Sequence, residues 1–206
     1  MLQTFLDGLA GMPRLWNVLR WIAEAGYVQH HQAIREMLTV PPGGGRFLDF
    51  GCGTGQFAGD FPADRYVGFD PARPYVTFAA RHRPGQFAVS DGTAVGLAGA
   101  QFDGALVLGV FHHLPDAIAG GCVRELRRLL KPGAMLLVIE DVPPPVWNVP
   151  GRIMHWLDRG NNIRTDADYR RLWAPHFTVT CDYGMRSGIC DYRVYVLRRV
   201  PEPATA

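Results

Sequence analysis

The clearest candidate for chemistry in this 206-residue chain is a glycine-rich turn that directly follows a short apolar run. The segment reads FLDFGCGTG, with Asp49 near the end of the run and a turn formed by Gly51, Gly53 and Gly55. Glycine accepts a positive φ and lets a ligand approach the backbone without a Cβ in the way. Residues 46–50 are therefore predicted to form a strand that ends at a ligand-binding turn.

Two further carboxylates stand where neighbouring predicted strands end. Asp70 closes the predicted strand 66–69, and Asp91 follows the predicted strand 86–89. The carboxyl ends of parallel strands meet at one edge of the sheet, which is where open α/β sheets bind ligands. Asp70 also follows the turn at about the distance at which doubly wound folds place a carboxylate for ribose hydroxyls. A nucleoside ligand is the prediction.

Two kinds of nucleoside ligand fit this pattern. A relaxed dinucleotide fingerprint, GxGxxA, fits the frame of Gly53, Gly55 and Ala58. If Gly51 is the first turn glycine, the third fingerprint position falls on Gln56, which obstructs the close packing needed there. Asp49 would repel a pyrophosphate, whereas it would attract the ammonium group of a methionine. The position of Gln56 and the charge of Asp49 thus both favour a ligand with a methionine part over a dinucleotide.

Strand and helix patterns alternate through the middle of the chain. Further strands are predicted at 102–108 and 135–139, and helices at 74–81 and 117–130. This alternation is typical of a parallel sheet covered by helices on both faces.

The end of the chain changes character. Thr165 and Asp168 form a capping box that predicts a helix through Trp173. Residues 177–182 and 192–197 then predict two strands joined closely enough for antiparallel pairing. We expect a mostly parallel seven-stranded sheet whose last strand is antiparallel.

Ahead of the first strand, residues 2–38 carry apolar side chains at helical spacing, among them Leu15, Trp16, Leu19, Trp21 and Ile22. Helices that pack on the domain edge are one interpretation, and a lid over the ligand is the other. The spacing favours packing, because such stripes usually face a core. We divide the chain into an N-terminal helical segment, 1–45, and a domain, 46–206.

Composition excludes several classes of protein. Apolar residues make up 48% of the chain and charged residues 19%, typical of a folded domain. The net charge of +2 is spread along the chain, which predicts no nucleic-acid partner. Four distant cysteines, without CxxC pairs or histidines at zinc spacing, predict reduced thiols and no metal. Neither a signal peptide nor a membrane span is indicated, so we expect a cytoplasmic protein.

Several segments together carry a family resemblance. They read LDFGCGTG, YVGFD, FAVSDG, FDGALVLGVFHHLPD and LRRLLKPGAMLLVIED, and cover roughly residues 46–141. In order and spacing they resemble the class I S-adenosylmethionine-dependent methyltransferases, in particular the small-molecule enzymes called type 11. The resemblance implies a Rossmann-like α/β fold in one domain, S-adenosyl-L-methionine as cofactor, and methyl transfer to a small-molecule acceptor.

The resemblance also implies roles for residues at the sheet edge. Asp49 and the turn glycines would hold the methionine part, Asp70 the ribose hydroxyls and Asp91 the adenine amino group, while the loop 109–112 would line the sulfur. An alternative for Asp91 is a turn residue before Gly92. The predicted cofactor-binding set is Asp49, Gly51, Cys52, Gly53, Gly55, Asp70, Pro71, Asp91, Gly92, Gly109 and Val110.

His113 and His112 follow the fourth predicted strand and are the catalytic candidates. Imidazole titrates near neutral pH, so either one suits a general base for an acceptor that must lose a proton. The alternative is that an imidazole bonds a backbone group and shapes the loop.

The segment 142–164 mixes aromatic residues and arginines, namely Trp147, Arg152, Trp156, Arg159 and Arg164. Such a lining would suit an apolar or aromatic acceptor with an acidic group. Packing and surface charge would explain the same residues equally well.

Two other classes of function compete with methyl transfer. A nicotinamide-dependent oxidoreductase is weakened by Gln56 and by the absence of a Tyr-xxx-Lys pair, since the one lysine, Lys131, sits in a turn. A non-catalytic scaffold that binds S-adenosylmethionine could keep every binding residue. A nucleobase acceptor is disfavoured, because residues 109–112 read GVFH and not an Asn-Pro-Pro-Tyr tetrad.

Overall fold

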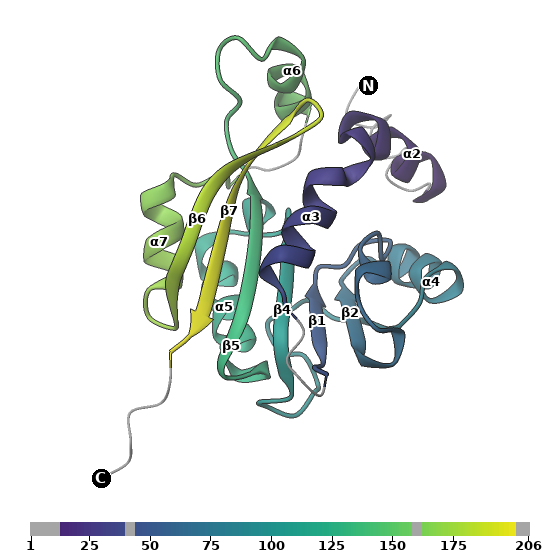
Figure 1. Cartoon of the computed structure of the whole chain (residues 1–206), viewed down its shortest axis with the longest axis vertical. Coiled ribbons are helices and arrows are strands. Elements are labelled where there is room, and N and C mark those ends of the chain that lie inside the picture. The colour runs from purple at the N-terminus through teal and green to yellow at the C-terminus, as the bar shows by residue number, and fades with distance from the viewer. Residues whose placement is uncertain (1–12, 40–43, 158–161, 201–206) are drawn as a thin grey trace.

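The computed structural model describes residues 13–39, 44–157 and 162–200, and it is built around one seven-stranded sheet with the order β3-β2-β1-β4-β5-β7-β6 (Figure 1). Strands β1 to β5 are parallel, and β7 runs antiparallel to both β5 and β6. This confirms the predicted sheet. The strands are β1 (Phe47–Phe50), β2 (Tyr66–Asp70), β3 (Gln86–Val89), β4 (Phe102–Leu108), β5 (Leu130–Asp141), β6 (Phe177–Ser187) and β7 (Cys190–Arg199).

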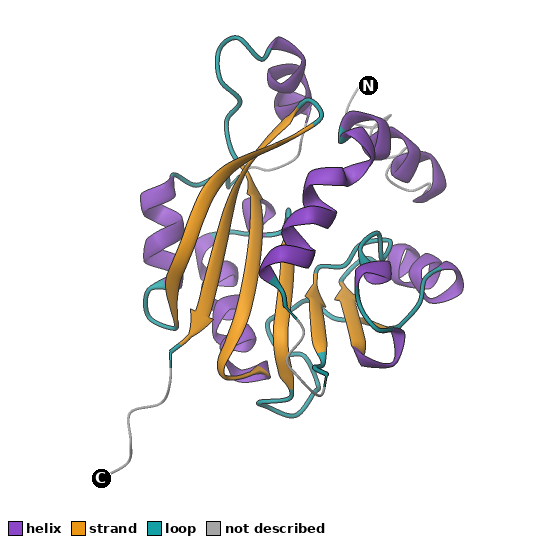
Figure 2. Ribbon diagram, in the orientation of Figure 1, coloured by secondary structure: helices purple, strands orange, loops and turns teal. Residues whose placement is uncertain are grey.

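Helices cover both faces of the sheet, as predicted (Figure 2). On one face, α5 and α7 bury residues such as Leu126 and Trp173 against the strands. On the other face, α3 buries Ile34 against Phe47 and Val194. The helices are α2 (Pro13–Ala23), α3 (Val28–Met37), α4 (Arg73–His82), α5 (Asp116–Leu129), α6 (Val149–Leu157) and α7 (Asp166–Trp173), with the short turns η1 (Ala25–Tyr27), η2 (Ala58–Asp60), η3 (Ala63–Arg65) and η4 (Phe111–His113).

The longest strand begins earlier than predicted. β5 starts at Leu130, and its register with β4 shifts between the pairs Phe102–Leu130 and Gly104–Met135. The Pro132–Gly133 turn is therefore an irregularity inside the strand, where Gly133 has a φ of 74°. The strand then continues to Asp141, so two acidic residues stand at its carboxyl end.

The two N-terminal helices differ in how they contact the rest of the structure: α3 packs on the sheet, whereas part of the apolar stripe of α2 is exposed. Leu19, Trp21 and Ile22 of α2 are exposed. The last residues of α2 contact the β6–β7 hairpin, where Arg20 donates to the Tyr192 hydroxyl and Ala23 accepts from the amide of Ile189. The side chains of Leu15 and Trp16, also in that stripe, lie outside the described residues.

Two smaller expectations concern the thiols and the membrane. All four cysteines are free. Across the described ranges, no helix combines the length and apolar character needed to cross a bilayer.

Candidate functional site

The glycine turn follows β1 directly and is fastened to β2. The amides of Gly51 and Cys52 both donate to the carbonyl oxygen of Phe69, at 2.9 Å each. A Cβ on Gly51 would lie 2.4 Å from Cγ2 of Val110, so packing requires glycine there. A Cβ on Gly53, where φ is 52°, would meet no atom within 4 Å. Gly53 therefore borders open space that a ligand can enter.

Asp70 ends β2 beside this turn, as predicted. Its Oδ2 accepts from the amide of Gly53 at 3.0 Å, and its Oδ1 accepts from the amide of Ala72 at 2.8 Å. Burial raises the pKa of Asp70, while the two backbone amides act in the opposite direction. A carboxylate oxygen can accept two hydrogen bonds, and each oxygen of Asp70 accepts one from the backbone, so Asp70 shapes the turn and still has acceptor capacity for ligand hydroxyls.

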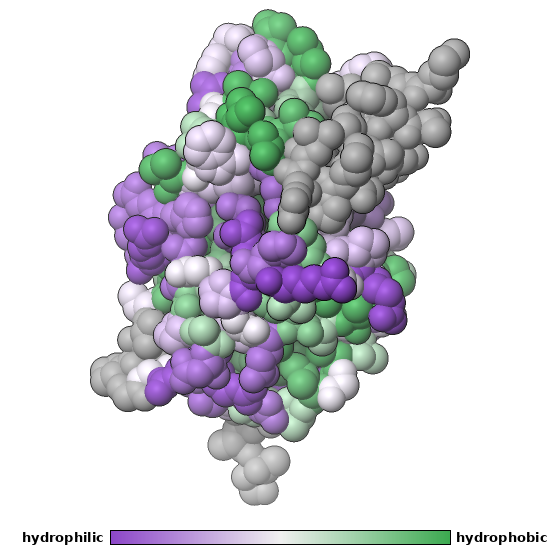
Figure 3. All heavy atoms as spheres, turned by 90° about the vertical axis from the view of Figure 1, so that its right-hand side faces the viewer, coloured by the Kyte–Doolittle hydropathy of each residue, from purple (hydrophilic) through white to green (hydrophobic). Residues whose placement is uncertain are grey.

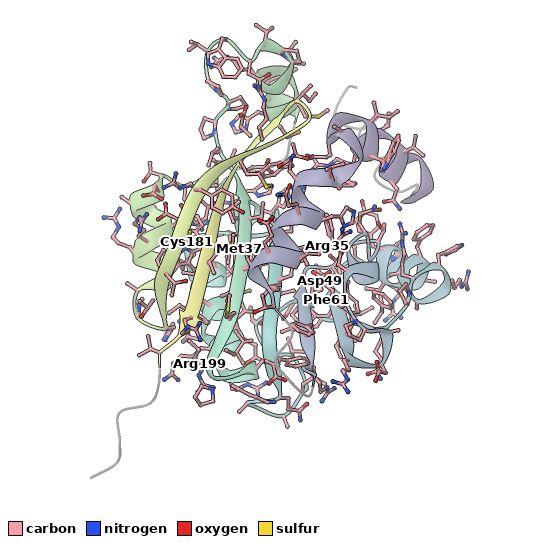
Figure 4. The ribbon with its side chains drawn as sticks, viewed as in Figure 1. Arg35, Met37, Asp49, Phe61, Cys181 and Arg199 are labelled. Atoms are coloured by element: carbon pink, nitrogen blue, oxygen red, sulfur yellow. The ribbon has the colours of Figure 1, made fainter. Side chains whose placement is uncertain are left out.

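Asp49 lies beneath the turn, on the face of the sheet that α3 covers (Figure 4). Its side chain is buried, and the Tyr66 hydroxyl donates to its Oδ2 at 2.6 Å. Burial raises the pKa of Asp49 to about 7; the Tyr66 hydrogen bond lowers it and the charge of Asp70 adds to the rise. Any attraction to a ligand ammonium group would thus act across the turn, and direct contact stays a prediction.

The other predicted cofactor residues have visible local roles. Oδ1 of Asp91 accepts from both the amide and the hydroxyl of Thr93 at 2.9 Å, and these bonds lower the pKa of this exposed carboxyl. That is the turn role, and the adenine contact stays a prediction. A Cβ on Gly92 would lie 2.6 Å from Cζ of Phe50, so Gly92 is explained by packing. Cys52 is buried and Pro71 is exposed.

The connection from the glycine turn to β2 contains no α-helix. In the described residues 51–65 only the 3-10 turns η2 and η3 occur. A dinucleotide fold places its pyrophosphate over the N-terminus of a helix that follows the first strand. This local structure offers no such helix end, which weakens the dinucleotide interpretation.

The turn after β4 is held by a residue that the sequence analysis missed. Gly109 has a φ of 64° and donates its amide to Ile139 of β5 at 2.8 Å. The chain then enters η4, whose amides point at the buried carboxylate of Glu140. The available signal was an acidic residue ending the apolar run of β5, the same signal that identified Asp70.

The structure separates the two histidine candidates. His112 is buried, with Nδ1 2.9 Å from Oε2 of Glu140 and Nε2 3.4 Å from Oδ2 of Asp141. His113 is exposed, and its ring centroid lies 3.9 Å from that of His112. The imidazole of His112 thus lies between two carboxylates.

Arg164 holds the turn after β4 through its hydrogen bonds. It is buried, and its guanidinium donates to the carbonyl oxygens of Phe111 and Leu114 at 2.6 Å each, and to Asp116 at 2.7 Å. It therefore fixes the carbonyl side of η4 and the residue after it.

The aromatic residues of the same segment lie at the surface. Trp147 and Trp156 are 66% and 75% exposed, and Arg186 of the β6–β7 hairpin stacks 4.4 Å above the Trp147 ring. Hydrophobic side chains gather at the end of the molecule where α6 lies (Figure 3). Arg152 is exposed, and Arg159 lies outside the described residues.

Met154 of α6 faces a small cavity at the carboxyl end of β5. Arg20, Asp141 and Cys190 also line this cavity, and the cavity volume is about 10 Å³. This is room for about one water molecule. The cavity connects α2 and α6 with the residue that faces Nε2 of His112.

Residues 48–138 match the protein family described as a methyltransferase domain. Over these residues the chain is similar to S-adenosylmethionine-dependent methyltransferases. These similarities support S-adenosylmethionine as the cofactor.

Among curated relatives, the tRNA (carboxymethyluridine(34)-5-O)-methyltransferase ALKBH8 of Mus musculus is 34% identical over 107 residues. The match covers 51% of this chain but only 16% of the mouse protein. The methyltransferase domain therefore corresponds to a small part of a much longer relative.

Two solved structures share the fold. Geranyl diphosphate C-methyltransferase from Streptomyces coelicolor A3(2), in complex with S-adenosyl-L-homocysteine, superposes with a TM-score of 0.68 at 13% identity, covering 84% of this chain and 81% of that one. The [4+2]-cyclase SpnF superposes with a TM-score of 0.67 at 18% identity, covering 84% and 80%. The same architecture thus occurs in proteins named for different reactions.

Proposed function

We propose that this domain binds S-adenosylmethionine at the edge formed by the glycine turn and Asp70, and transfers its methyl group to a small-molecule acceptor. One observation carries the proposal: Gly53 borders open space directly beside a carboxylate, Asp70, that has acceptor capacity for ribose hydroxyls. The amide of Gly53 donates to the carboxylate of Asp70 at 3.0 Å, so each of the two groups holds the other in place.

When bound, S-adenosylmethionine supplies an activated methyl group on a sulfonium, and its transfer leaves a neutral thioether. The protein's own contribution is to align the acceptor in line with that methyl group and to exclude water. Positioning of this kind can supply several kcal/mol, about 7 to 11 in the best intramolecular cases. Val110 packs on Gly51 and so connects the turn after β4 with the edge formed by the glycine turn and Asp70, here called the cofactor edge. In this way it contributes to the alignment.

A protein base is needed only for an acceptor hydroxyl or protonated amine. His112 is the stronger candidate, because two carboxylates flank its imidazole and would stabilise a proton on it. His113, which is exposed beside it, is the second candidate.

The proposed acceptor is apolar or aromatic. The support is the exposed apolar surface of α6, which carries Ile153 and Trp156, together with the contribution of Met154 to the cavity beside Asp141. A tRNA acceptor is the second candidate, because the mouse relative is named as a tRNA methyltransferase. The small net charge of +2 favours the small molecule.

The test is incubation with isotopically labelled S-adenosylmethionine and, in separate reactions, a small-molecule extract and total tRNA, followed by mass spectrometry. Label in a small molecule is the expected result. Label in tRNA alone would move the assignment to the second candidate. Binding of S-adenosylhomocysteine with no label in either fraction would indicate a non-catalytic scaffold.

A further inference from the structure

The turn after β4 presents an unusual number of hydrogen-bond donors to one buried side chain. Oε1 of Glu140 accepts from the amides of Val110 at 3.0 Å and Phe111 at 2.8 Å. Oε2 accepts from the amide of His112 at 3.2 Å, from its Nδ1 at 2.9 Å and from the Tyr169 hydroxyl at 3.4 Å. Successive backbone amides of this kind form an anion-binding concavity, and here the anion belongs to the protein.

Burial makes this arrangement costly to disturb. Glu140 is fully buried and His112 nearly so. A buried carboxylate without its donors, or a buried amide without its acceptor, loses the solvation that water would give. The turn is held from its other side as well, because Arg164 donates to the carbonyl oxygen of Phe111.

This turn links the cofactor edge to the histidine. At one end Val110 packs on Gly51, with no room for a Cβ between them. At the other end the imidazole of His112 lies between Glu140 and Asp141. A movement of the turn would displace both groups together.

The carboxylate also selects the tautomer of His112. Both oxygens of Glu140 already accept hydrogen bonds from backbone amides, so the carboxylate acts as the acceptor here and Nδ1 of His112 is the donor. Nε2, the other ring nitrogen, then faces Oδ2 of Asp141 at 3.4 Å.

We propose that Glu140 is a positioning residue for methyl transfer: it holds the turn 109–112 against the glycine turn and sets the tautomer of His112. This rests on the proposed function. Glu140 touches neither cofactor nor acceptor, and it acts through Val110 and His112. An acceptor that must lose a proton, a hydroxyl or an ammonium, is the class that such an imidazole serves.

The test compares Glu140→Gln with Glu125→Gln. Glu125 is also a buried glutamate, and it accepts from a loop amide, that of Val95, at 2.8 Å, and from none of the amides of the turn after β4. Three quantities are measured: amide hydrogen exchange at Val110 and Phe111, the Kd of S-adenosylhomocysteine, and kcat with the acceptor found above.

For Glu140→Gln we expect exchange at these two amides to be at least about tenfold faster, kcat to fall about 30-fold or more, and Kd to stay within about fivefold of the parent. Glu125→Gln should leave all three close to the parent. Unchanged exchange, a kcat within about threefold of the parent, or a loss confined to Kd would each overturn the proposal.

The exchange measurement needs no acceptor. It reports on the Glu140 contacts even if no methyl transfer is found, so failure of the proposed function and failure of this inference are distinguishable. Should Glu140→Gln not fold, Glu140→Asp, which keeps the charge and shortens the side chain by one methylene, replaces it with the same expected directions.

Discussion

The hydroxyl of Tyr66 donates a hydrogen bond of 2.6 Å to Asp49, the carboxylate beneath the glycine turn. Both side chains are buried, and burial raises the pKa of Asp49 to about 7. This hydrogen bond joins β2 to the end of β1 and places a titrating group under the glycine turn. It has a measurable consequence for stability.

We predict that Asp49 makes the ligand-free protein less stable as pH rises. Its pKa in the folded state, about 7, lies above the ordinary value of 3.8, so folding favours the protonated form. Its contribution is complete below about pH 4 and is lost as pH rises through 7, with a slope of up to about 1.4 kcal/mol per pH unit.

Urea unfolding of the parent and of Asp49→Asn at pH 5, 6, 7 and 8 isolates this slope as the difference between the two proteins. Tyr66→Phe is the companion variant, because losing its hydrogen bond should shift the transition to higher pH. Parallel stability curves for the parent and Asp49→Asn would contradict the assignment.

Gly53→Ala should separate binding from stability. Gly53 has a φ of 52° and open space where a Cβ would stand, so the variant should fold with a loss of only about 1 to 2 kcal/mol from backbone strain. The new methyl group would occupy ligand space, and the Kd of S-adenosylhomocysteine should rise by about 30-fold or more, equivalent to about 2 kcal/mol.

Gly133→Ala is the matched control for that experiment. Gly133 has a φ of 74° and also no atom within 4 Å of a Cβ, but it lies in the irregular start of β5. It should lose similar stability and keep the parent's affinity. Equal affinities for the two variants would mean that the ligand does not approach Gly53.

His30 should be a source of acid instability. It is buried, its two ring nitrogens have no hydrogen-bond partner within the described part of the chain, and Tyr27, Phe57 and Tyr192 surround it. Burial, with the charges of Arg20 and His31, lowers the pKa of His30 to about 3.

Between about pH 3 and pH 6.5, His30 therefore binds a proton in the unfolded chain but not in the folded protein. Stability is lost as pH falls from 6.5 toward 3, and His30→Leu should remove that loss. The stability gap between variant and parent should shift in favour of the variant by up to about 1.4 kcal/mol per pH unit over this range. His82→Leu, at an exposed histidine, is the control variant. A difference in stability between His30→Leu and the parent that does not change with pH would refute the prediction.

The sheet was predictable because most of its strands are apolar runs, and because α4 lies between β2 and β3 and α5 between β4 and β5. Even so, β6 extends to Ser187, well past the predicted residue 182, since polar residues such as Arg186 hide the strand pattern there. The exposure of Trp21 in α2 was not predictable either, because helical spacing identifies a face without identifying a partner.

Within the site, the glycine turn and Asp70 were predictable from their own sequence. Glu140 was missed because its partners, Val110 and His112, lie about 30 residues away and come to it only when β4 pairs with β5. Asp91 shows the opposite case: its place at the sheet edge suggested a ligand, whereas its visible partner is its own neighbour, Thr93.

The central claim is that the edge formed by the glycine turn and Asp70 binds S-adenosylmethionine, and titration calorimetry tests it most directly. The parent should bind S-adenosylmethionine and S-adenosylhomocysteine with one-to-one stoichiometry and show no binding of a nicotinamide dinucleotide. Asp70→Ala should weaken binding about 30- to 150-fold, equivalent to about 2 to 3 kcal/mol. Asp103→Ala, at a carboxylate that accepts the Arg46 amide where β4 begins, should not weaken it. Tighter binding of the dinucleotide, or equal affinity of the parent and Asp70→Ala for S-adenosylhomocysteine, would contradict the account.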